Sequence, residues 1–176
     1  YISASSNMTM TEVRTNKALA AKRYHPVSEN IQFKDSTGKG MDWVESVVKY
    51  ERPDVVILDM GDKFADIRSE RTDITLKAAA IHARNIAKQY DCAVIWMSQL
   101  SAEAEGRADL NQAMMEGSKT GKAAEADLMI LIGKTQQAEG EEEDPVRYLN
   151  IAKNKLNGYQ GKITCVLDGS RSVYSA

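Results

Sequence analysis

Cysteine and histidine are scarce in this sequence. Its 176 residues include two Cys and two His, too few for a structural zinc site or for the disulfide framework of a small secreted domain. Cys92 and Cys165 both lie within apolar runs, where a small buried side chain is the usual interpretation. We therefore expect a protein of a reducing compartment, the cytoplasm.

Long apolar segments and a strong net charge are also missing. No apolar run reaches the ~18 residues of a membrane-spanning helix, and no signal peptide is visible, so we expect no membrane partner. The net charge of −2 provides no overall basic field, and any contact with DNA must come from local patches. The length predicts one domain over 1–176. Because the sequence begins at Tyr1 without Met, we expect a chain truncated at its N-terminus.

The segment from Pro53 to Leu100 organises the sequence. The apolar runs at 55–58 and 93–96 lack polar alternation, which is typical of strands covered on both faces of a parallel sheet. The helical pattern between them predicts the crossover of a βαβ unit, so the polar residues after the two strands should meet at one edge. These residues are Asp59 after the first strand and Ser98-Gln99 after the second.

An acidic residue directly after four apolar ones matches the Walker B pattern. The carboxylate of that pattern helps to hold Mg²⁺ against nucleotide phosphates, usually through water. The alternative is that Asp59 merely ends a buried strand. Gly38-Lys39 does not make a phosphate-binding loop, because Phe33 and Gly40 occupy the positions that need Gly and Ser or Thr.

The whole pattern predicts an α/β fold with a mainly parallel central sheet, helices on both faces and a C-terminal antiparallel β-hairpin. We expect strands at 1–4, 31–33, 127–132, 146–153, 163–167 and 173–174, and helices at 9–24, 41–52 and 72–90. The dipeptide Asn157-Gly158 predicts the turn of the hairpin. Residues 101–121 carry no strand signal, and so long a loop is usually functional or disordered.

Helical spacing also predicts which residues of the third helix share a face. We expect Ile74, Lys77, Ala78, Ile81 and Ile86 on one face of the helix at 72–90, with His82 and Arg84 on its solvated side.

Four stretches, in order over nearly the whole chain, resemble one family. They are VVILDM at 55–60, IWMSQL at 95–100, MEGSKTGKAAEADLMILI at 115–132 and LNIAKNKLNGYQGKITCVL at 149–167. Together they resemble the C-terminal RecA-like ATPase domain of DnaB-type replicative DNA helicases, in a bacteriophage version. The resemblance implies a RecA-like P-loop NTPase core, the cofactors ATP and Mg²⁺, and a homo-hexamer acting on single-stranded DNA. A primase or a helicase loader is an implied further partner.

The resemblance also implies roles for particular residues. Asp59 would bind Mg²⁺, and Ser98 and Gln99 would contact the nucleotide, with Gln99 sensing the γ-phosphate. Lys153 and Lys155, on one side of a strand, would reach the nucleotide of the neighbouring subunit. DNA would be bound by Lys63, Arg68 and Arg71 after the first of these strands, and by Arg107, Asn111, Lys119 and Lys122 in the long loop.

The sequence departs from the family pattern at three places. The Walker A loop has no counterpart in these residues, Lys155 stands where the family usually has Arg, and Asn7 aligns with the catalytic Glu. An amide does not accept a proton from attacking water as a carboxylate does, so either Asn7 marks a weakened site or Glu12 or a residue outside this chain is the base. Two alternatives stay open: a catalytically inactive RecA-like module that binds DNA or a partner, and a RecA-like recombinase.

Overall fold

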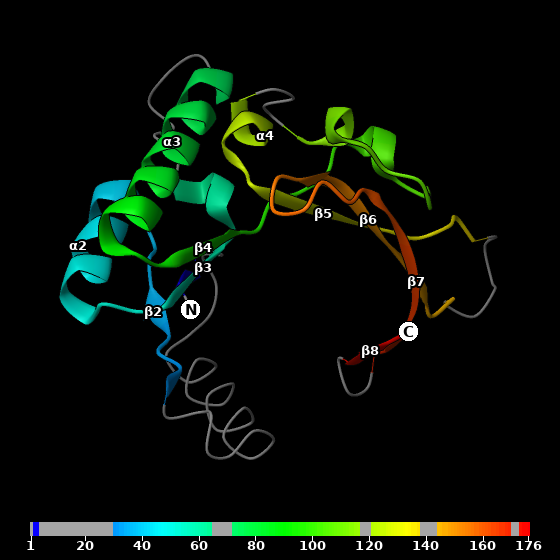
Figure 1. Cartoon of the computed structure of the whole chain (residues 1–176), viewed down its shortest axis with the longest axis horizontal. Coiled ribbons are helices and arrows are strands. Elements are labelled where there is room, and N and C mark those ends of the chain that lie inside the picture. The colour runs from blue at the N-terminus through cyan, green and yellow to red at the C-terminus, as the bar shows by residue number, and fades with distance from the viewer. Residues whose placement is uncertain (1, 4–29, 65–71, 117–120, 138–143, 170–172) are drawn as a thin grey trace. The chain divides into compact units, whose positions relative to one another are not determined.

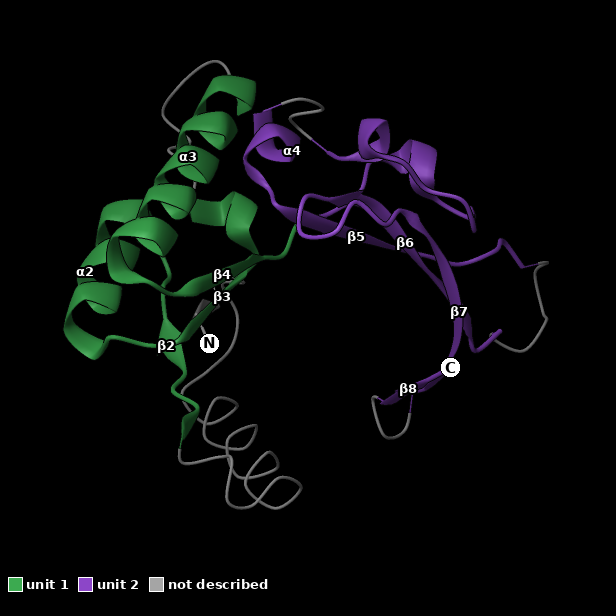
Figure 2. Cartoon of the chain, in the orientation of Figure 1, with its two compact units in different colours: residues 1–98 green, residues 99–176 purple. Residues whose placement is uncertain are grey.

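The computed structural model describes residues 2–3, 30–64, 72–116, 121–137, 144–169 and 173–176. The chain divides into two compact units, Tyr1–Ser98 and Gln99–Ala176, shown in green and purple in Figure 2. Each unit has its own sheet and its own hydrophobic core. The single domain over 1–176 stays a prediction. Within the described ranges, no helix is long and apolar enough to cross a membrane.

The first unit is built on a parallel sheet in the order β2-β1-β3-β4 (Figure 1). Its strands are β1 (Ile2–Ser3), β2 (Lys34–Asp35), β3 (Val55–Asp59) and β4 (Ala93–Trp96). β3 and β4 are adjacent and parallel as predicted, with Leu58 opposite Trp96. The strand predicted at 31–33 is wrong in its position, because the residues that pair with β1 are Lys34, opposite Ile2, and Asp35, opposite Ser3. Alternating polarity indicates extended backbone without fixing its partner.

Two helices pack on one face of this sheet (Figure 1). They are α2 (Met41–Glu51) and α3 (Thr72–Tyr90), close to the predicted bounds. Val56 and Leu58 alternate inward from β3 and belong to the same core as both helices. α2 ends before Arg52, which adopts a left-handed conformation with φ 50° and leads into the strand.

The buried face of α3 differs from the predicted one. Ile74 and Ile81 are 52% and 38% exposed, whereas Leu76, Ala79, Ala83 and Ile86 are buried. The short alanine side chains allow α3 to approach its neighbours closely, since the distance between packed helices depends on the side chains at the contact. The prediction is therefore confirmed for Ile86 and wrong for Ile74 and Ile81.

His82 was expected on the solvated side of α3, and this was wrong. Its Nε2 lies 2.7 Å from Glu45 Oε2 on α2, and Tyr90 donates a hydrogen bond of 3.1 Å to the other oxygen of Glu45. Arg84 is half-buried as well. The hydrogen bond from His82, followed by that from Tyr90, lowers the pKa of the Glu45 carboxyl. This side of α3 therefore faces α2 and not water alone.

The second unit is an antiparallel sheet in the order β5-β6-β7-β8. The strands are β5 (Leu128–Gly133), β6 (Val146–Asn154), β7 (Gly161–Asp168) and β8 (Val173–Ser175), and a short helix α4 (Gly121–Glu125) precedes them. All four predicted strands are confirmed to within two residues. The apolar run of β5 is not covered on both faces, because burial alternates along it and Ile130 and Ile132 are exposed.

Residues 101–116, part of the long loop expected to be functional or disordered, form a packed segment, so the disordered alternative is wrong for them. They contain two 3-10 helices, η3 (Ala102–Ala104) and η4 (Gln112–Met114), and Leu110, Met114 and Met115 join the core of the second unit. Gln112 donates to the carbonyl of Ala152 at 2.7 Å.

The buried Asn150 ties the same segment to the sheet, since its Nδ2 donates to the carbonyl of Ala108 at 2.9 Å. The segment passes so close to β5 that a Cβ on Gly133 would lie 2.5 Å from the carbonyl oxygen of Arg107. Only glycine fits there without a shift of the backbone.

Several predictions lie outside the described residues. They are the helix at 9–24 with Asn7 and Glu12, and the candidate DNA-binding residues Arg68, Arg71 and Lys119.

Candidate functional site

The candidate site begins where β3 and β4 end together. Because Leu58 is opposite Trp96 in a parallel ladder, Asp59 and the residues after Trp96 lie at the same edge of the sheet. The backbone pairing continues past the strands, with Met97 N donating to Leu58 O at 3.1 Å and Gly61 N donating to Met97 O at 2.8 Å. Asp59 and Ser98 are both half-buried at this edge. The backbone therefore fixes the two chain segments against each other.

A residue that the sequence interpretation did not single out connects these segments. The carboxylate of Asp62, in the 3-10 helix η2 (Gly61–Phe64), accepts one hydrogen bond at each oxygen. Trp96 Nε1 donates to Oδ1 at 3.0 Å, and Ser98 Oγ donates to Oδ2 at 2.6 Å. The position of Asp62 just after the strand that ends in Asp59 was the available signal, but nothing in the sequence indicated its partners.

Gly61 makes room for this arrangement. A Cβ at position 61 would overlap the indole ring of Trp96. Residue 61 is buried, and Phe64 at the end of η2 belongs to the core of the unit. The turn after Asp59 is therefore packed directly against the end of β4.

Gln99 is the first residue of the second unit. Its backbone carbonyl accepts a hydrogen bond of 3.4 Å from Glu116 N, and Leu100 forms an isolated antiparallel bridge with Met115. The side chain is exposed. Its role as a phosphate sensor stays a prediction.

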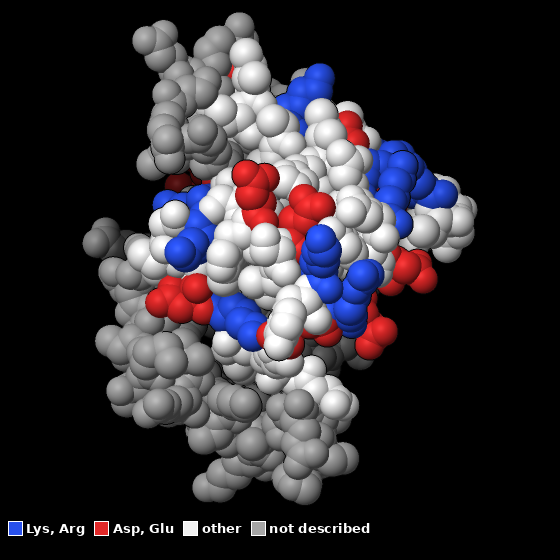
Figure 3. All heavy atoms as spheres, turned by 90° about the vertical axis from the view of Figure 1, so that its left-hand side faces the viewer, with Lys and Arg blue, Asp and Glu red and all other residues white. Residues whose placement is uncertain are grey.

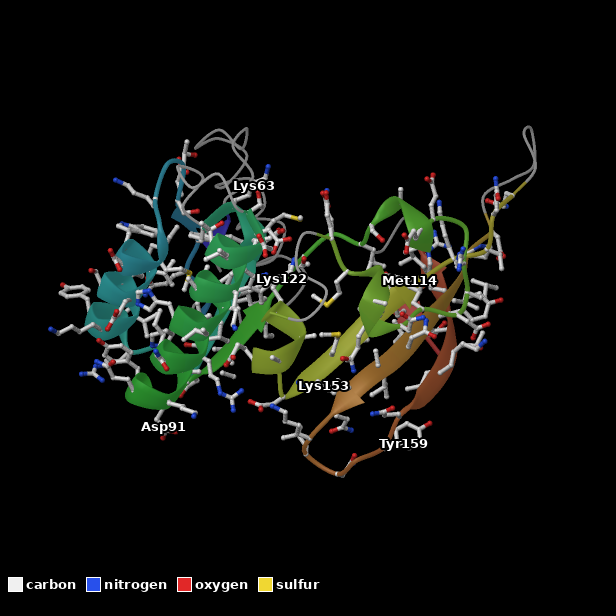
Figure 4. The ribbon with its side chains drawn as sticks, turned by 90° about the horizontal axis from the view of Figure 1, so that it is seen from above. Lys63, Asp91, Met114, Lys122, Lys153 and Tyr159 are labelled. Carbon is white, nitrogen blue, oxygen red and sulfur yellow. The ribbon has the colours of Figure 1, made fainter. Side chains whose placement is uncertain are left out.

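Lys153, in β6, and Lys155, just after the end of that strand, both contact the end of α4. Lys153 Nζ donates to the carbonyl oxygens of Ala123 and Ala124, and Lys155 Nζ lies 3.4 Å from the same Ala124 oxygen and 3.5 Å from Asp127 Oδ1. Figure 4 shows Lys153 at this position, close to α4 and β5. Both ammonium groups thus lie against carbonyl oxygens that have no helical donor in the last turn of α4, where positive charge is favourable.

The two lysines differ in exposure. Lys153 is half-buried, while the side chain of Lys155 is 45% exposed, and an ammonium group has three donors. Lys155 can therefore bind a further anion while it keeps its contacts with Ala124 and Asp127. Contact with a neighbouring subunit stays a prediction.

The hairpin that carries these lysines has an ordered turn. Asn154 Oδ1 accepts from the backbone N–H of Leu156 at 3.0 Å, and Asn157 Oδ1 accepts from that of Tyr159 at 3.0 Å. Gly158 has φ +76°, which favours glycine. The turn predicted from Asn157-Gly158 is confirmed.

The candidate DNA-binding residues have different surroundings. Lys63 and Arg107 are exposed. The side chain of Asn111 caps η4 by accepting from Ala113 N at 2.9 Å. Lys122 is only 5% exposed, so we do not retain it among the proposed phosphate contacts. On the face drawn in Figure 3, basic and acidic side chains are interspersed, with no single broad basic patch.

The chemistry of the edge fits a magnesium ion held partly by a nucleotide. Within the described ranges, no group of three or more His, Cys, Asp or Glu could hold a metal by itself. Mg²⁺ commonly keeps several waters and takes one or two carboxylates together with substrate phosphates. A single carboxylate such as that of Asp59 at the end of a parallel strand is consistent with this mode.

No protein-family model matches the sequence, and no curated protein matches it either. Solved structures do resemble the fold. One is described as "ATPase Domain of G40P", with a TM-score of 0.76 and 16% identity over 98% of this chain and 72% of that one. Another is described as "The Structure Of A DnaB-Like Replicative Helicase And Its Interactions With Primase", with a TM-score of 0.72 and 18% identity. That match covers 97% of this chain and 42% of the other, so the present chain spans less than half of its length. The chain therefore has the fold of the ATPase domain of DnaB-type replicative helicases, as its four motifs predicted.

Proposed function

We propose that this chain is the motor domain of an ATP-dependent replicative DNA helicase. It would act as a homo-hexameric ring that couples ATP hydrolysis between subunits to translocation on single-stranded DNA in the cytoplasm, in the host cell if it comes from a bacteriophage. The observation that carries the proposal is the pairing of β3 with β4, which brings Asp59 and Ser98 to one edge in a helicase-type ATPase fold.

Each residue at this edge has a distinct part in the proposed reaction. Bound Mg²⁺ would neutralise phosphate charge as the terminal phosphoryl group is transferred to water. Asp59 would hold the ion through water, and Gln99 would respond to the terminal phosphate. Ser98 donates its one hydroxyl proton to Asp62, and its oxygen would accept a hydrogen bond from a water bound to the phosphates. Lys155 and Lys153 of the neighbouring subunit would add positive charge where negative charge develops.

The phosphates of single-stranded DNA would be bound without base specificity. Lys63 and Arg107 are exposed cations suited to this contact. Arg68, Arg71 and Lys119 are further candidates from the sequence. A primase or a loader would bind elsewhere on the full-length protein.

The test is ATP hydrolysis by the full-length protein with and without single-stranded DNA, together with strand unwinding. Asp59→Ala should abolish both, whereas the matched variant Asp54→Ala should preserve them, because Asp54 is exposed at the opposite end of the same strand. A full-length protein without DNA-stimulated hydrolysis, or Asp59→Ala at the wild-type rate, would contradict the proposal.

A second candidate is an inactive RecA-like module that binds DNA or a partner, and Asn7 at the position of the catalytic Glu favours it. The coding sequence upstream of Tyr1 separates the two, since a GxxxxGK[S/T] motif there supports the motor. Strand exchange without unwinding would instead indicate a recombinase.

A further inference from the structure

We propose that Asp62 is a positioning residue for ATP hydrolysis, which keeps the strand end that carries Ser98 in register with the turn after Asp59. This inference rests on the proposed function. Asp62 would touch neither nucleotide nor metal and would act through Ser98 and Trp96.

The hydrogen bonds of Asp62 support this role. Trp96 and Ser98 are alternate residues of an extended segment and therefore project to the same side. They engage the two oxygens of one carboxylate, at 3.0 Å and 2.6 Å. A hydroxyl bound to a carboxylate at such a short distance is a charge-assisted hydrogen bond, which is roughly twice as strong as a neutral one.

The location of these bonds makes them relevant to the reaction. Asp62 lies in η2, the turn that directly follows the strand end at Asp59, and Ser98 directly precedes Gln99. The backbone bond between Gly61 and Met97 joins the same two segments, and the Trp96 ring fills the space over Gly61. A displacement of one segment therefore displaces the other.

A purely structural role and a positioning role give different results. If Asp62 only stabilises the fold, variants that fold should hydrolyse ATP at the wild-type kcat. If Asp62 fixes the geometry of the reacting groups, kcat should fall while the KM for ATP changes little, because misplacement by about 1 Å can cost ~10²-fold in rate.

The experiment measures kcat, KM for ATP and the melting temperature of the full-length protein as wild type, Asp62→Asn and Ser98→Ala. Asp62→Asn retains the shape but replaces one acceptor oxygen with an amino group. We expect a fall in kcat of about 10–100-fold in both variants, with a change in KM below about 3-fold. The control is Asp54→Asn, which makes the same chemical change at the other end of β3 and should match the wild type.

Two further variants test the bond itself. Ser98→Thr keeps the hydroxyl and should retain most of kcat. The double variant Asp62→Asn/Ser98→Ala should be no slower than the slower single variant, because both changes remove one shared interaction.

The outcomes are distinguishable. An inactive wild type refutes the proposed function itself. An active wild type with a folded Asp62→Asn at unchanged kcat refutes only the positioning role. If Asp62→Asn does not fold, Ser98→Ala decides, and an unchanged kcat in that variant overturns the inference. A change confined to KM, or additive effects in the double variant, would also contradict it.

Discussion

Replacing Gly61 with alanine tests the packing between η2 and β4. The added methyl would overlap the indole of Trp96, and its three nearest atoms all belong to that ring. Since residue 61 is buried, the ring must move or the turn must shift. Overpacking of this kind typically costs about 1–3 kcal/mol. Movement of the ring would also break the hydrogen bond from its Nε1 to Asp62, which is 3.0 Å long.

Urea unfolding followed by far-UV circular dichroism measures this cost. Gly61→Ala should lower the midpoint without changing the slope, and the melting temperature should fall by about 2–4 °C for each kcal/mol. The control is Gly169→Ala, because a Cβ there meets nothing within 4 Å.

A double-mutant cycle identifies the cause. Trp96→Leu removes the ring that the methyl group meets, so Gly61→Ala should cost less in that background than in the wild type. If Gly61→Ala is as stable as the wild type to within about 0.5 kcal/mol, or if its cost is the same with Leu at position 96, the packing argument is refuted.

Three further predictions concern other parts of the chain. Asn150→Ala should lower stability by about 1–3 kcal/mol in urea unfolding, because buried carbonyls lose their donor, and a neutral effect would contradict this. The hydrogen bond from His82 lowers the pKa of the Glu45 carboxyl in the folded protein. The ionised carboxylate therefore stabilises the fold fully at neutral pH, and this contribution is lost as the pH falls below about 4.3. Glu45→Gln should therefore show less acid destabilisation in melting curves between neutral and acidic pH, and identical curves would refute this. Lys155→Ala should lower kcat of the assembled ring by at least ~10²-fold. Lys162→Ala, on the same hairpin, removes an ion pair to Asp109 of the segment at 101–116 and should leave kcat within about 3-fold. Equal losses in the two lysine variants would contradict a specific role.

The elements could be predicted from the sequence where local pattern determines them. The runs at β3 and β4 are apolar and are separated by one helix, which leaves the parallel crossover as the natural arrangement. The turn at Asn157-Gly158 follows from the conformational freedom of glycine. These features need no knowledge of distant contacts.

What could not be predicted depends on residues far apart in the chain. The buried face of α3 combines Leu76 and Ile86 with three alanines, whose small size matters only once the neighbouring helix is known. The packed segment at 101–116 owes its order to bonds with Asn150 and Ala152, about forty residues away. In the sequence Asp62 is one acidic residue among many, and only its hydrogen bonds to Trp96 and Ser98 distinguish it. Single-sequence patterns carry no information of this kind.

Binding of a metal–nucleotide complex tests the central claim most directly, with Mn²⁺ as a spectroscopic substitute for Mg²⁺. Electron paramagnetic resonance titration of the full-length protein with Mn²⁺ and ATP gives the affinity for the ion in the ternary complex. We predict that Asp59→Ala weakens this affinity at least ~10-fold, as the loss of a ligand or of an outer-sphere partner does, and that Asp54→Ala does not. Equal Mn²⁺ affinities in the two variants would show that the carboxylate at the end of β3 is not part of a nucleotide site.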